Sequence, residues 1–249
     1  MAKDSKQLLP SDIPFPMRLN RFMALKGLAT RRKADELIAA GWVQLDGKVA
    51  KVGDKVVHDG QVVTLDERAE QSESEYVYYA YYKPRGIITH SPQHREQSIA
   101  DVSGIRGVFP VGRLDKDSEG LIILTNDGRI TERLLSPRLK HEKEYIVTVR
   151  EVLPREIKKI LEQGIEDGGE RLTAEEVTLQ GRHQLHMVLT EGKKHEIRRM
   201  LATFNLKIIE LRRVRIMGVL LGALRPGEKR ALTGKARRAF LEALGLLGK

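Results

Sequence analysis

The stretch VFPVGRLDKDSEGLIILTNDG, residues 108–128, joins a charged loop to a continuous apolar run. The run at 121–124 is short and wholly apolar, which predicts a buried strand in the interior of a sheet. The loop before it places an arginine and an aspartate two residues apart, with two further acids close behind. These four side chains are Arg113, Asp115, Asp117 and Glu119. A charged loop at the start of a buried strand is therefore the first candidate for a functional site.

The composition favours a polyanionic partner. The chain has 249 residues, 41% of them hydrophobic, and a net charge of +10. This basic excess is typical of proteins that meet RNA, DNA or an anionic membrane, and charge alone does not separate the three. Because there is no cysteine, disulfides and thiolate-bound metals are excluded. No run approaches the ~20 apolar residues of a spanning helix and no secretory signal is evident, so we expect a cytoplasmic protein.

Residues 17–64 have the pattern of two helices followed by strands. Leu19, Phe22 and Met23 share one helical face, and Thr30 is a suitable N-cap for a second helix. Further on the pattern alternates, and the pair Asp46-Gly47 predicts a hairpin turn. We expect residues 1–16 to form a tail before this module.

Three cations, Arg31, Arg32 and Lys33, fill the first turn of the second helix. Each opposes the helix dipole by about 0.3–1 kcal/mol when exposed. Their position is explained if the start of the helix faces phosphates. A solvated cluster of charges is the plainer alternative.

The acidic, polar stretch 65–75 is expected to be a flexible linker, followed by a larger domain at 76–249. In this domain strands and helices alternate irregularly, which predicts an α+β fold on a largely antiparallel sheet. The final helix is expected to pack Ala236, Phe240 and Leu244. The other expected elements are strands within 76–86, 144–149 and 183–192 and helices within 153–164 and 194–204.

Common explanations of the charged loop fit poorly. Asp115, Asp117 and Gly120 match positions 1, 3 and 6 of a calcium loop, but position 12 is Asn126 where a bidentate Glu is needed. Two carboxylates two residues apart on an extended chain point to opposite faces, so they pair poorly as glycosidase acids. The chain also lacks the G-x-S-x-G and Walker A patterns.

Histidine metal sites are not indicated either. His183 and His186 lie an odd number of positions apart in an expected strand, so they face opposite sides. His90 and His94 lie in a polar loop without acids at ligand spacing. A single carboxylate in a basic setting is what remains, and the segment 193–215 supplies eight Lys and Arg against two acids.

Several motifs, taken together and in order, resemble one family. Residues 17–64, which begin with MRLNRFMALKGLATRRKADELIAAGWVQLDGKVAKVGDKV, resemble the S4 RNA-binding module. GRLDKDSEGLIILTNDG resembles the catalytic motif of the RsuA branch of pseudouridine synthases, and with HEKEYIVTV it is most similar to the F-type large-subunit ribosomal RNA enzymes of that branch. The KPRG turn, EGKKHEIRRM and RVRIMGVLLGALRPGEKRALT follow in the order of the branch. The resemblance implies an S4-type αα-β module followed by a mixed, largely antiparallel catalytic domain.

The resemblance also implies roles for individual residues. Asp115 would be the catalytic carboxylate, Tyr145 would stack on the target base, and Arg198 would pair with the carboxylate. The substrate-binding residues would be Arg113, which enters the RNA stack, Ile216, and Lys83 of the KPRG turn. Met217 stands where the branch often has glycine. The RNA-binding residues would be Arg18, Lys26, Arg31, Arg32, Lys33, Lys193, Lys194 and Arg199.

The implied reaction is an isomerisation of uridine, in which the base leaves the sugar, turns and rejoins through C5. It implies no metal and no organic cofactor. The expected partner is structured RNA, 23S ribosomal RNA foremost and transfer RNA as a second target, bound by a monomer with no membrane association. A catalytically inactive S4-type factor that binds ribosomal RNA or assists ribosome assembly is the alternative.

Overall fold

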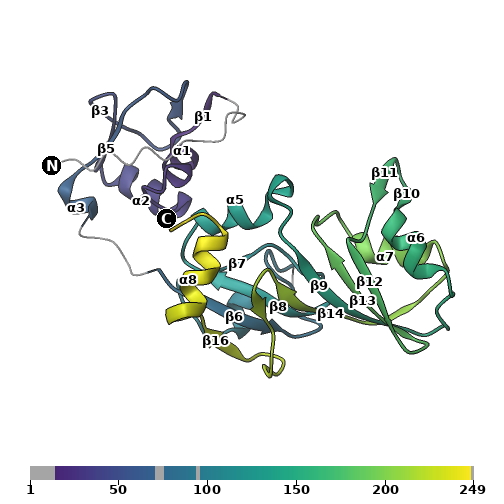
Figure 1. Cartoon of the computed structure of the whole chain (residues 1–249). Coiled ribbons are helices and arrows are strands. Elements are labelled where there is room, and N and C mark those ends of the chain that lie inside the picture. Colours follow the sequence, from purple (N-terminus) through teal and green to yellow (C-terminus); the bar gives the residue numbers. More distant parts are fainter. Residues whose placement is uncertain (1–14, 71–75, 94–95, 248–249) are drawn as a thin grey trace. The chain divides into compact units, whose positions relative to one another are not determined.

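The computed structural model describes residues 15–70, 76–93 and 96–247 (Figure 1). The chain divides into two compact units, one of residues 1–76 with 127–129 and the other of residues 77–126 with 130–249. Most of the expected tail, residues 1–14, and the stretch 71–75 of the expected linker lie outside the described residues.

The N-terminal unit has the expected order of two helices followed by strands. Its core is formed by the apolar faces of both helices together with strand residues such as Val43 and Val56. Strand β1 pairs with β4, and β2 lies between β3 and β5 in a second small antiparallel sheet. The elements are β1 (Met17–Arg18), α1 (Leu19–Leu25), α2 (Arg31–Ala39), β2 (Val43–Leu45), β3 (Lys48–Val49), β4 (Lys55–Val56), β5 (Val63–Leu65) and α3 (Glu67–Glu70).

Local signals in this unit form as the sequence predicts. The Thr30 hydroxyl caps α2 by accepting a hydrogen bond from the Lys33 backbone N–H at 3.2 Å. Asp46 and Gly47 both have positive φ, 50° and 76°, and form a two-residue turn between β2 and β3.

The first part of the expected linker forms regular structure and belongs to the N-terminal unit. Residues 65–70 form the end of β5 and the short helix α3. Ala69 packs into the N-terminal core and is 6% exposed, while Arg68 forms an ion pair with Asp66 at 2.8 Å. The polar composition of the stretch concealed this one apolar contact.

The second unit is built on a mixed, mainly antiparallel sheet in the order β12-β13-β9-β14-β8-β6-β16, with β15 paired to β14 and β7 paired to β8. This confirms the expected α+β class. The strands are β6 (Tyr78–Lys83), β7 (Phe109–Val111), β8 (Glu119–Thr125), β9 (Lys143–Val149), β12 (Glu176–Gln180), β13 (Gln184–Leu189), β14 (Ile208–Ile216), β15 (Val219–Leu220) and β16 (Lys229–Ala231), with a separate hairpin of β10 (Ile165–Asp167) and β11 (Glu170–Leu172). The helices are α4 (Ile99–Val102), α5 (Arg129–Leu135), α6 (Ile157–Gln163), α7 (Glu196–Ala202) and α8 (Gly234–Ala243), with a 3-10 turn at Pro137–Leu139.

Helices α6 and α7 pack together on one part of this sheet, and α8 packs separately. The apolar residues of α6 and α7 pack with those of β9, β12 and β13 in one core cluster. The α8 helix buries Phe240 and Leu244, as expected, but Ala236 is exposed. In the next position Arg237 instead lies 5.1 Å from the ring of Tyr78 in β6.

Strand β8 is the interior strand that the opening motif predicts. All four residues of 121–124 are 0% exposed, because β8 lies between β14 and β6 in the middle of the sheet. The pairing of β8 with β14 is parallel and the other strand pairs of this sheet are antiparallel.

Gly120, at the start of β8, allows the parallel pair to form. It has a φ of +103° and stands opposite Arg213 of β14. A Cβ atom here would lie 2.3 Å from the Arg213 carbonyl oxygen, so the two backbones meet only because Gly120 has no side chain. The loop that precedes β8 is positioned by this contact.

Candidate functional site

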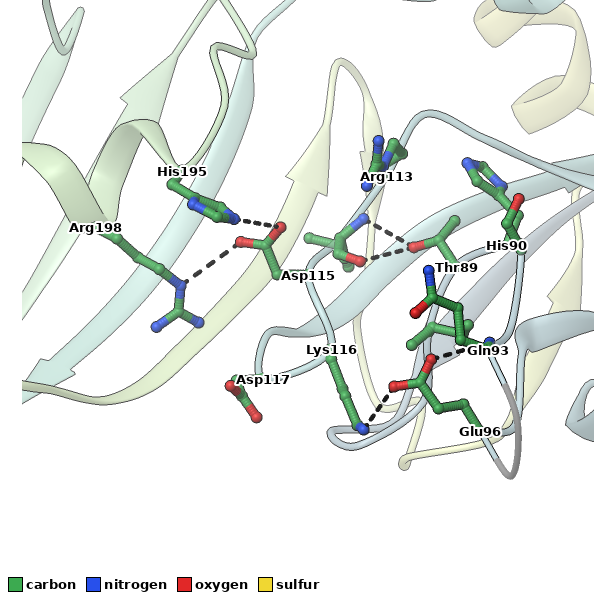
Figure 2. A pocket seen from close by; sticks show the side chains of 13 residues that line it. Thr89, His90, Gln93, Glu96, Arg113, Asp115, Lys116, Asp117, His195 and Arg198 are labelled. Atoms are coloured by element: carbon green, nitrogen blue, oxygen red, sulfur yellow. Dashed lines mark hydrogen bonds and ion pairs between the residues drawn. The ribbon is translucent and has the colours of Figure 1, made fainter. Parts of the chain in front are cut away.

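A cavity of about 440 Å³ opens at the loop between β7 and β8 (Figure 2). We call residues 112–118 the Asp115 loop. The opposite wall is formed by side chains from residues 88–93 and by Glu96, and two more side chains come from Arg198 of α7 and from His195, which precedes that helix. The residues that line the cavity are Ile88, Thr89, His90, Ser91, Gln93, Glu96, Arg113, Leu114, Asp115, Lys116, Asp117, His195 and Arg198.

Two nitrogen-bearing side chains flank the Asp115 carboxylate. Arg198 Nε lies 3.6 Å from Asp115 Oδ2, and His195 Nε2 lies 3.6 Å from Oδ1 (Figure 2). Arg198 also donates a hydrogen bond from Nη2 to the hydroxyl of Ser118 at 3.0 Å. The structure thus brings Asp115 and Arg198 together, as the sequence predicts, and adds His195 as a further partner.

Side-chain and backbone hydrogen bonds hold the middle of the Asp115 loop. The Thr89 hydroxyl donates to the Leu114 carbonyl at 2.7 Å and accepts from the Leu114 N–H at 3.1 Å. The Gly86 N–H donates to the Lys116 carbonyl at 2.8 Å. The residues on each side of Asp115 are therefore fixed through their backbones.

Lys83 is part of this support and does not reach the cavity. Its side chain is 0% exposed, and Nζ donates at 2.8 Å to the carbonyls of both Pro84 and Ser118. Burial lowers the pKa of Lys83 to about 8, although the nearby Asp115, Glu119 and Asp117 carboxylates oppose that shift. Lys83 is therefore absent from the residues that line the cavity, and its ammonium group is held by the carbonyls of Pro84 and Ser118.

Arg213 of β14 also holds the Asp115 loop through hydrogen bonds to backbone carbonyls. Its side chain is 4% exposed, and it donates from Nε to the Leu121 carbonyl at 2.7 Å and from Nη1 to the Arg113 carbonyl at 3.5 Å. It spans both sides of the loop, since Arg113 precedes Asp115 and Leu121 follows Gly120.

The opposite wall of the cavity is tied to the loop by one ion pair. Lys116 Nζ lies 2.8 Å from Glu96 Oε1, and the other oxygen of Glu96 accepts from the Gln93 N–H at 3.2 Å. The bond to Glu96 raises the pKa of Lys116. His90 lines the same wall, and burial followed by the charge of Arg113 lowers its pKa.

Two of the other expected site residues lie outside the lining of the cavity. Tyr145 is half-buried in β9 beside the core under α7, with Met187 and Arg213 opposite it on neighbouring strands. Ile216 is 2% exposed at the end of β14. Met217 follows with a φ of 50°, a left-handed conformation in which glycine is least strained. Arg113 does line the cavity.

The expected RNA-binding cations of the N-terminal unit differ in availability. Arg18, Arg31 and Arg32 are exposed, and in the described part of the chain no ion pair engages them. Lys26 pairs with Asp59 at 2.8 Å, and Lys33 pairs with Glu36 at 3.6 Å.

In the second unit, Lys194 is exposed, but the other two expected cations are engaged. Arg199 forms ion pairs with Asp167 and Glu170, which lie on the β10–β11 hairpin. Lys193 pairs with Glu191. The two carboxylates that engage Arg199 lie about thirty residues away in the sequence.

The sequence reading missed His195 and the residues that hold the loop. The three-residue spacing of His195 and Arg198 does not by itself place both on one helical face, because His195 precedes α7 and has a left-handed backbone. Thr89, Ser118 and Arg213 carry no local signal either.

Neither a membrane span nor a metal cluster is found in the described ranges 15–70, 76–93 and 96–247. No helix there has the length and apolar character to cross a bilayer. No group of three or more His, Asp or Glu side chains there is arranged to hold a metal ion.

Comparisons with known proteins match one family model in each of the two units. Residues 77–203 match the RNA pseudouridylate synthase family, and residues 17–63 match the S4 domain. The dual-specificity RNA pseudouridine synthase RluF of Escherichia coli (strain K12) is 36% identical over 219 residues, which cover 87% of this chain and 76% of that protein.

Two further matches cover nearly the whole of each partner. Ribosomal large subunit pseudouridine synthase B of Bacillus subtilis (strain 168) is 33% identical over 226 residues, 87% of this chain and 92% of that protein. A solved crystal structure of a pseudouridylate synthase superposes with a TM-score of 0.66 and 26% identity, covering 92% of this chain and 99% of that one. The resemblance seen in the sequence motifs is thereby confirmed, and the chain belongs to the RNA pseudouridylate synthase family, as an isomerase that carries an S4 domain before its catalytic domain.

Proposed function

We propose that the protein converts a specific uridine of ribosomal RNA to pseudouridine, with Asp115 as the catalytic carboxylate. The observation that carries the proposal is the Asp115 side chain, which lines a cavity with a cationic or imidazole nitrogen near each of its oxygens. Membership of the pseudouridylate synthase family indicates the isomerisation of uridine, and we propose that the uridine binds in the cavity beside Asp115.

The reaction needs a base that has left its helix. A stacked base hides the bond between N1 and the ribose, and extruding it costs a few kcal/mol. In the reaction this C–N bond breaks, the uracil turns, and a bond forms from the ribose carbon to C5. The proton on C5 is lost and N1 is protonated, so no other substrate is required.

The loop geometry suits an enzyme that must hold one carboxylate still. Thr89, Lys83 and Arg213 fix the backbone of the Asp115 loop: each donates a hydrogen bond to one of its carbonyls, and Thr89 also accepts one from the Leu114 N–H. Such preorganisation lets the carboxylate meet the nucleotide without a reorganisation cost at the moment of reaction.

The remaining roles follow from the family resemblance. Tyr145 is proposed to lie against the extruded base, Ile216 to add to the apolar wall, and Arg113 to enter the RNA stack where the base has left. The exposed cations Arg18, Arg31, Arg32 and Lys194 are the proposed phosphate contacts, together with Lys26, Lys33 and Lys193 through their partly exposed side chains.

The proposed substrate is 23S ribosomal RNA, with transfer RNA as a second target, because relatives are named as large-subunit and dual-specificity enzymes. We place the reaction in the cytoplasm, carried out by a monomer, without a metal or an organic cofactor. The boundaries proposed for the domains are 17–64 for the S4 module and 76–249 for the catalytic domain.

The test is the replacement Asp115→Asn. We expect it to abolish pseudouridine formation in ribosomal RNA transcripts while RNA affinity stays within about threefold, since one exposed carboxylate contributes little to binding. Asp117→Asn is the matched control, because it removes an acid from the same loop that has no ion pair within the described residues. Product is mapped by carbodiimide modification and primer extension.

Separate 23S, 16S and transfer RNA substrates identify the target in the same assay. If Asp115→Asn turned over near the wild-type rate, the assignment of the carboxylate would be wrong. If the wild-type protein left every cellular RNA unmodified while binding it, the inactive RNA-binding factor would be the better description.

A further inference from the structure

We propose that His195 is a positioning residue for Asp115, acting on the second carboxylate oxygen. This inference rests on the proposed role of Asp115. His195 Nε2 lies 3.6 Å from Oδ1, and Arg198 Nε lies 3.6 Å from Oδ2, so each oxygen has its own partner (Figure 2).

Two partners restrict the carboxylate in a way that one cannot. The terminal torsion of an aspartate, between Cβ and the planar carboxylate, is broad and weakly restrained by itself. With Arg198 alone the carboxylate could turn about this bond and present either oxygen. A second partner on the other oxygen selects one plane, and that plane decides which atom meets the nucleotide.

The backbone at His195 supports a functional reason for the side chain. His195 immediately precedes α7 and has a φ of 53° and a ψ of 30°, in the left-handed region. Residues other than glycine adopt this conformation at a cost, and a residue held there suggests a role. Helix capping does not supply that role, since the His195 side chain makes no cap hydrogen bond.

The charged groups around Asp115 come from three elements. His195 and Arg198 approach from the start of α7, and Arg113, Lys116 and Asp117 line the cavity from the Asp115 loop itself. Lys83 approaches from β6 but donates to two backbone carbonyls. Among the described residues, His195 and Arg198 are therefore the side chains within 4 Å that form ion pairs with the carboxylate.

The solvent exposure of His195 and Asp115 determines how strongly the two side chains interact in the free protein and in the RNA complex. The His195 side chain is 49% exposed and that of Asp115 is 38% exposed, so in the free protein water screens the pair and it contributes little. RNA that fills the cavity removes this water and strengthens the interaction. The contact should therefore act on the chemical step within the complex, with little effect on folding or on RNA capture.

Three variants test the inference. Asn tolerates the left-handed backbone, but its amide is too short to reach Asp115, whereas the Gln amide nitrogen extends about as far as imidazole Nε2. We expect His195→Asn to lower kcat about tenfold, with KM within about twofold, and His195→Gln to recover most of the loss. His183→Asn is the control, because His183 is exposed and bonds to the Glu151 carbonyl away from the cavity.

A spectroscopic arm separates this inference from the proposed function. In long-range ¹H–¹⁵N spectra of the full chain, Asp115→Asn should shift the Nε2 resonance of His195 and leave that of His183 in place. This reads the contact itself and does not require turnover.

The outcomes are distinguishable. Wild-type kcat in His195→Asn, or an unshifted His195 resonance in Asp115→Asn, overturns the positioning role even when Asp115→Asn is inactive. An equal loss in the Asn and Gln variants, with a lowered unfolding midpoint in both, would mean a merely structural residue and would also overturn it. Full activity in Asp115→Asn defeats the proposed function and, with it, this inference.

Discussion

Replacing Lys83 with methionine should remove a rise in the unfolding free energy of the catalytic unit that the wild-type protein shows between pH 7 and pH 9.5. Methionine keeps much of the length of the side chain but removes the only ionisable group at that position. Lys83 is 0% exposed, and burial lowers its pKa from 10.5 to about 8 in the folded protein. The unfolded chain keeps the ordinary lysine pKa, so the two states bind protons differently between these values.

The sign follows from which state binds more protons. Between about pH 8 and pH 10.5 the unfolded chain is still protonated and the folded protein is not, so raising the pH stabilises the fold. From the two pKa values, the penalty for holding the charge is about 3.4 kcal/mol at pH 7 and about 1.4 kcal/mol at pH 9.5. The wild-type protein should therefore gain about 2 kcal/mol relative to Lys83→Met over this range.

Urea unfolding at pH 7.0, 8.0, 9.0 and 9.5 measures this difference. The single tryptophan, Trp42, belongs to the N-terminal unit, so its fluorescence does not report on the sheet. Far-UV circular dichroism and backbone amide hydrogen exchange are better probes of the sheet. Lys158→Met, which removes an exposed lysine from α6, controls for the loss of one positive charge.

The reasoning would be refuted by a wild-type minus Lys83→Met difference that stays constant within about 0.5 kcal/mol from pH 7 to 9.5. It would equally be refuted by a difference of the opposite sign. A constant difference would mean that the ammonium group is solvated in the native state, and a difference of the opposite sign would mean that the nearby carboxylates raise its pKa more than burial lowers it.

Two further replacements test the support of the Asp115 loop. Gly120→Ala should destabilise the protein by at least about 3 kcal/mol, because its Cβ would lie 2.3 Å from the Arg213 carbonyl oxygen. Gly107→Ala, with a φ of 75° and no atom within 4 Å of the added Cβ, should cost only about 1 kcal/mol in the same urea titration, and equal costs would argue against the steric explanation. Thr89→Val keeps the shape but leaves the Leu114 N–H and carbonyl unpaired, so we expect about 2–4 kcal/mol lower stability by urea unfolding and slower pseudouridine formation. Wild-type stability in Thr89→Val would show that these hydrogen bonds are replaced by water.

The sequence predicted the parts of the fold that depend on short-range pattern. The short apolar run 121–124 predicted an interior strand, and the hairpin at Asp46-Gly47 needs nothing beyond two residues that tolerate positive φ. The spacing of Ile197, Met200 and Leu201 likewise marks the buried face of α7.

The parts that sequence pattern did not predict depend on contacts between distant segments. Lys83 belongs to a turn motif that looks exposed, yet it is enclosed because the Asp115 loop folds over it. Arg199 is occupied by two acids from a hairpin whose position no local pattern fixes. His195 reaches Asp115 only through a left-handed backbone at the start of α7, and no periodicity reports that conformation.

The wide separation in sequence between Asp115 and its supports has a consequence during protein synthesis. Arg198 follows Ser118 by 80 positions, and Arg213 follows Leu121 by 92. At about 5–20 residues per second, a ribosome takes roughly 4–16 s to add the first of these arginines after the loop has been made. A nascent chain therefore carries the Asp115 loop without its contacts to Arg198 and Arg213 until these late residues have been translated.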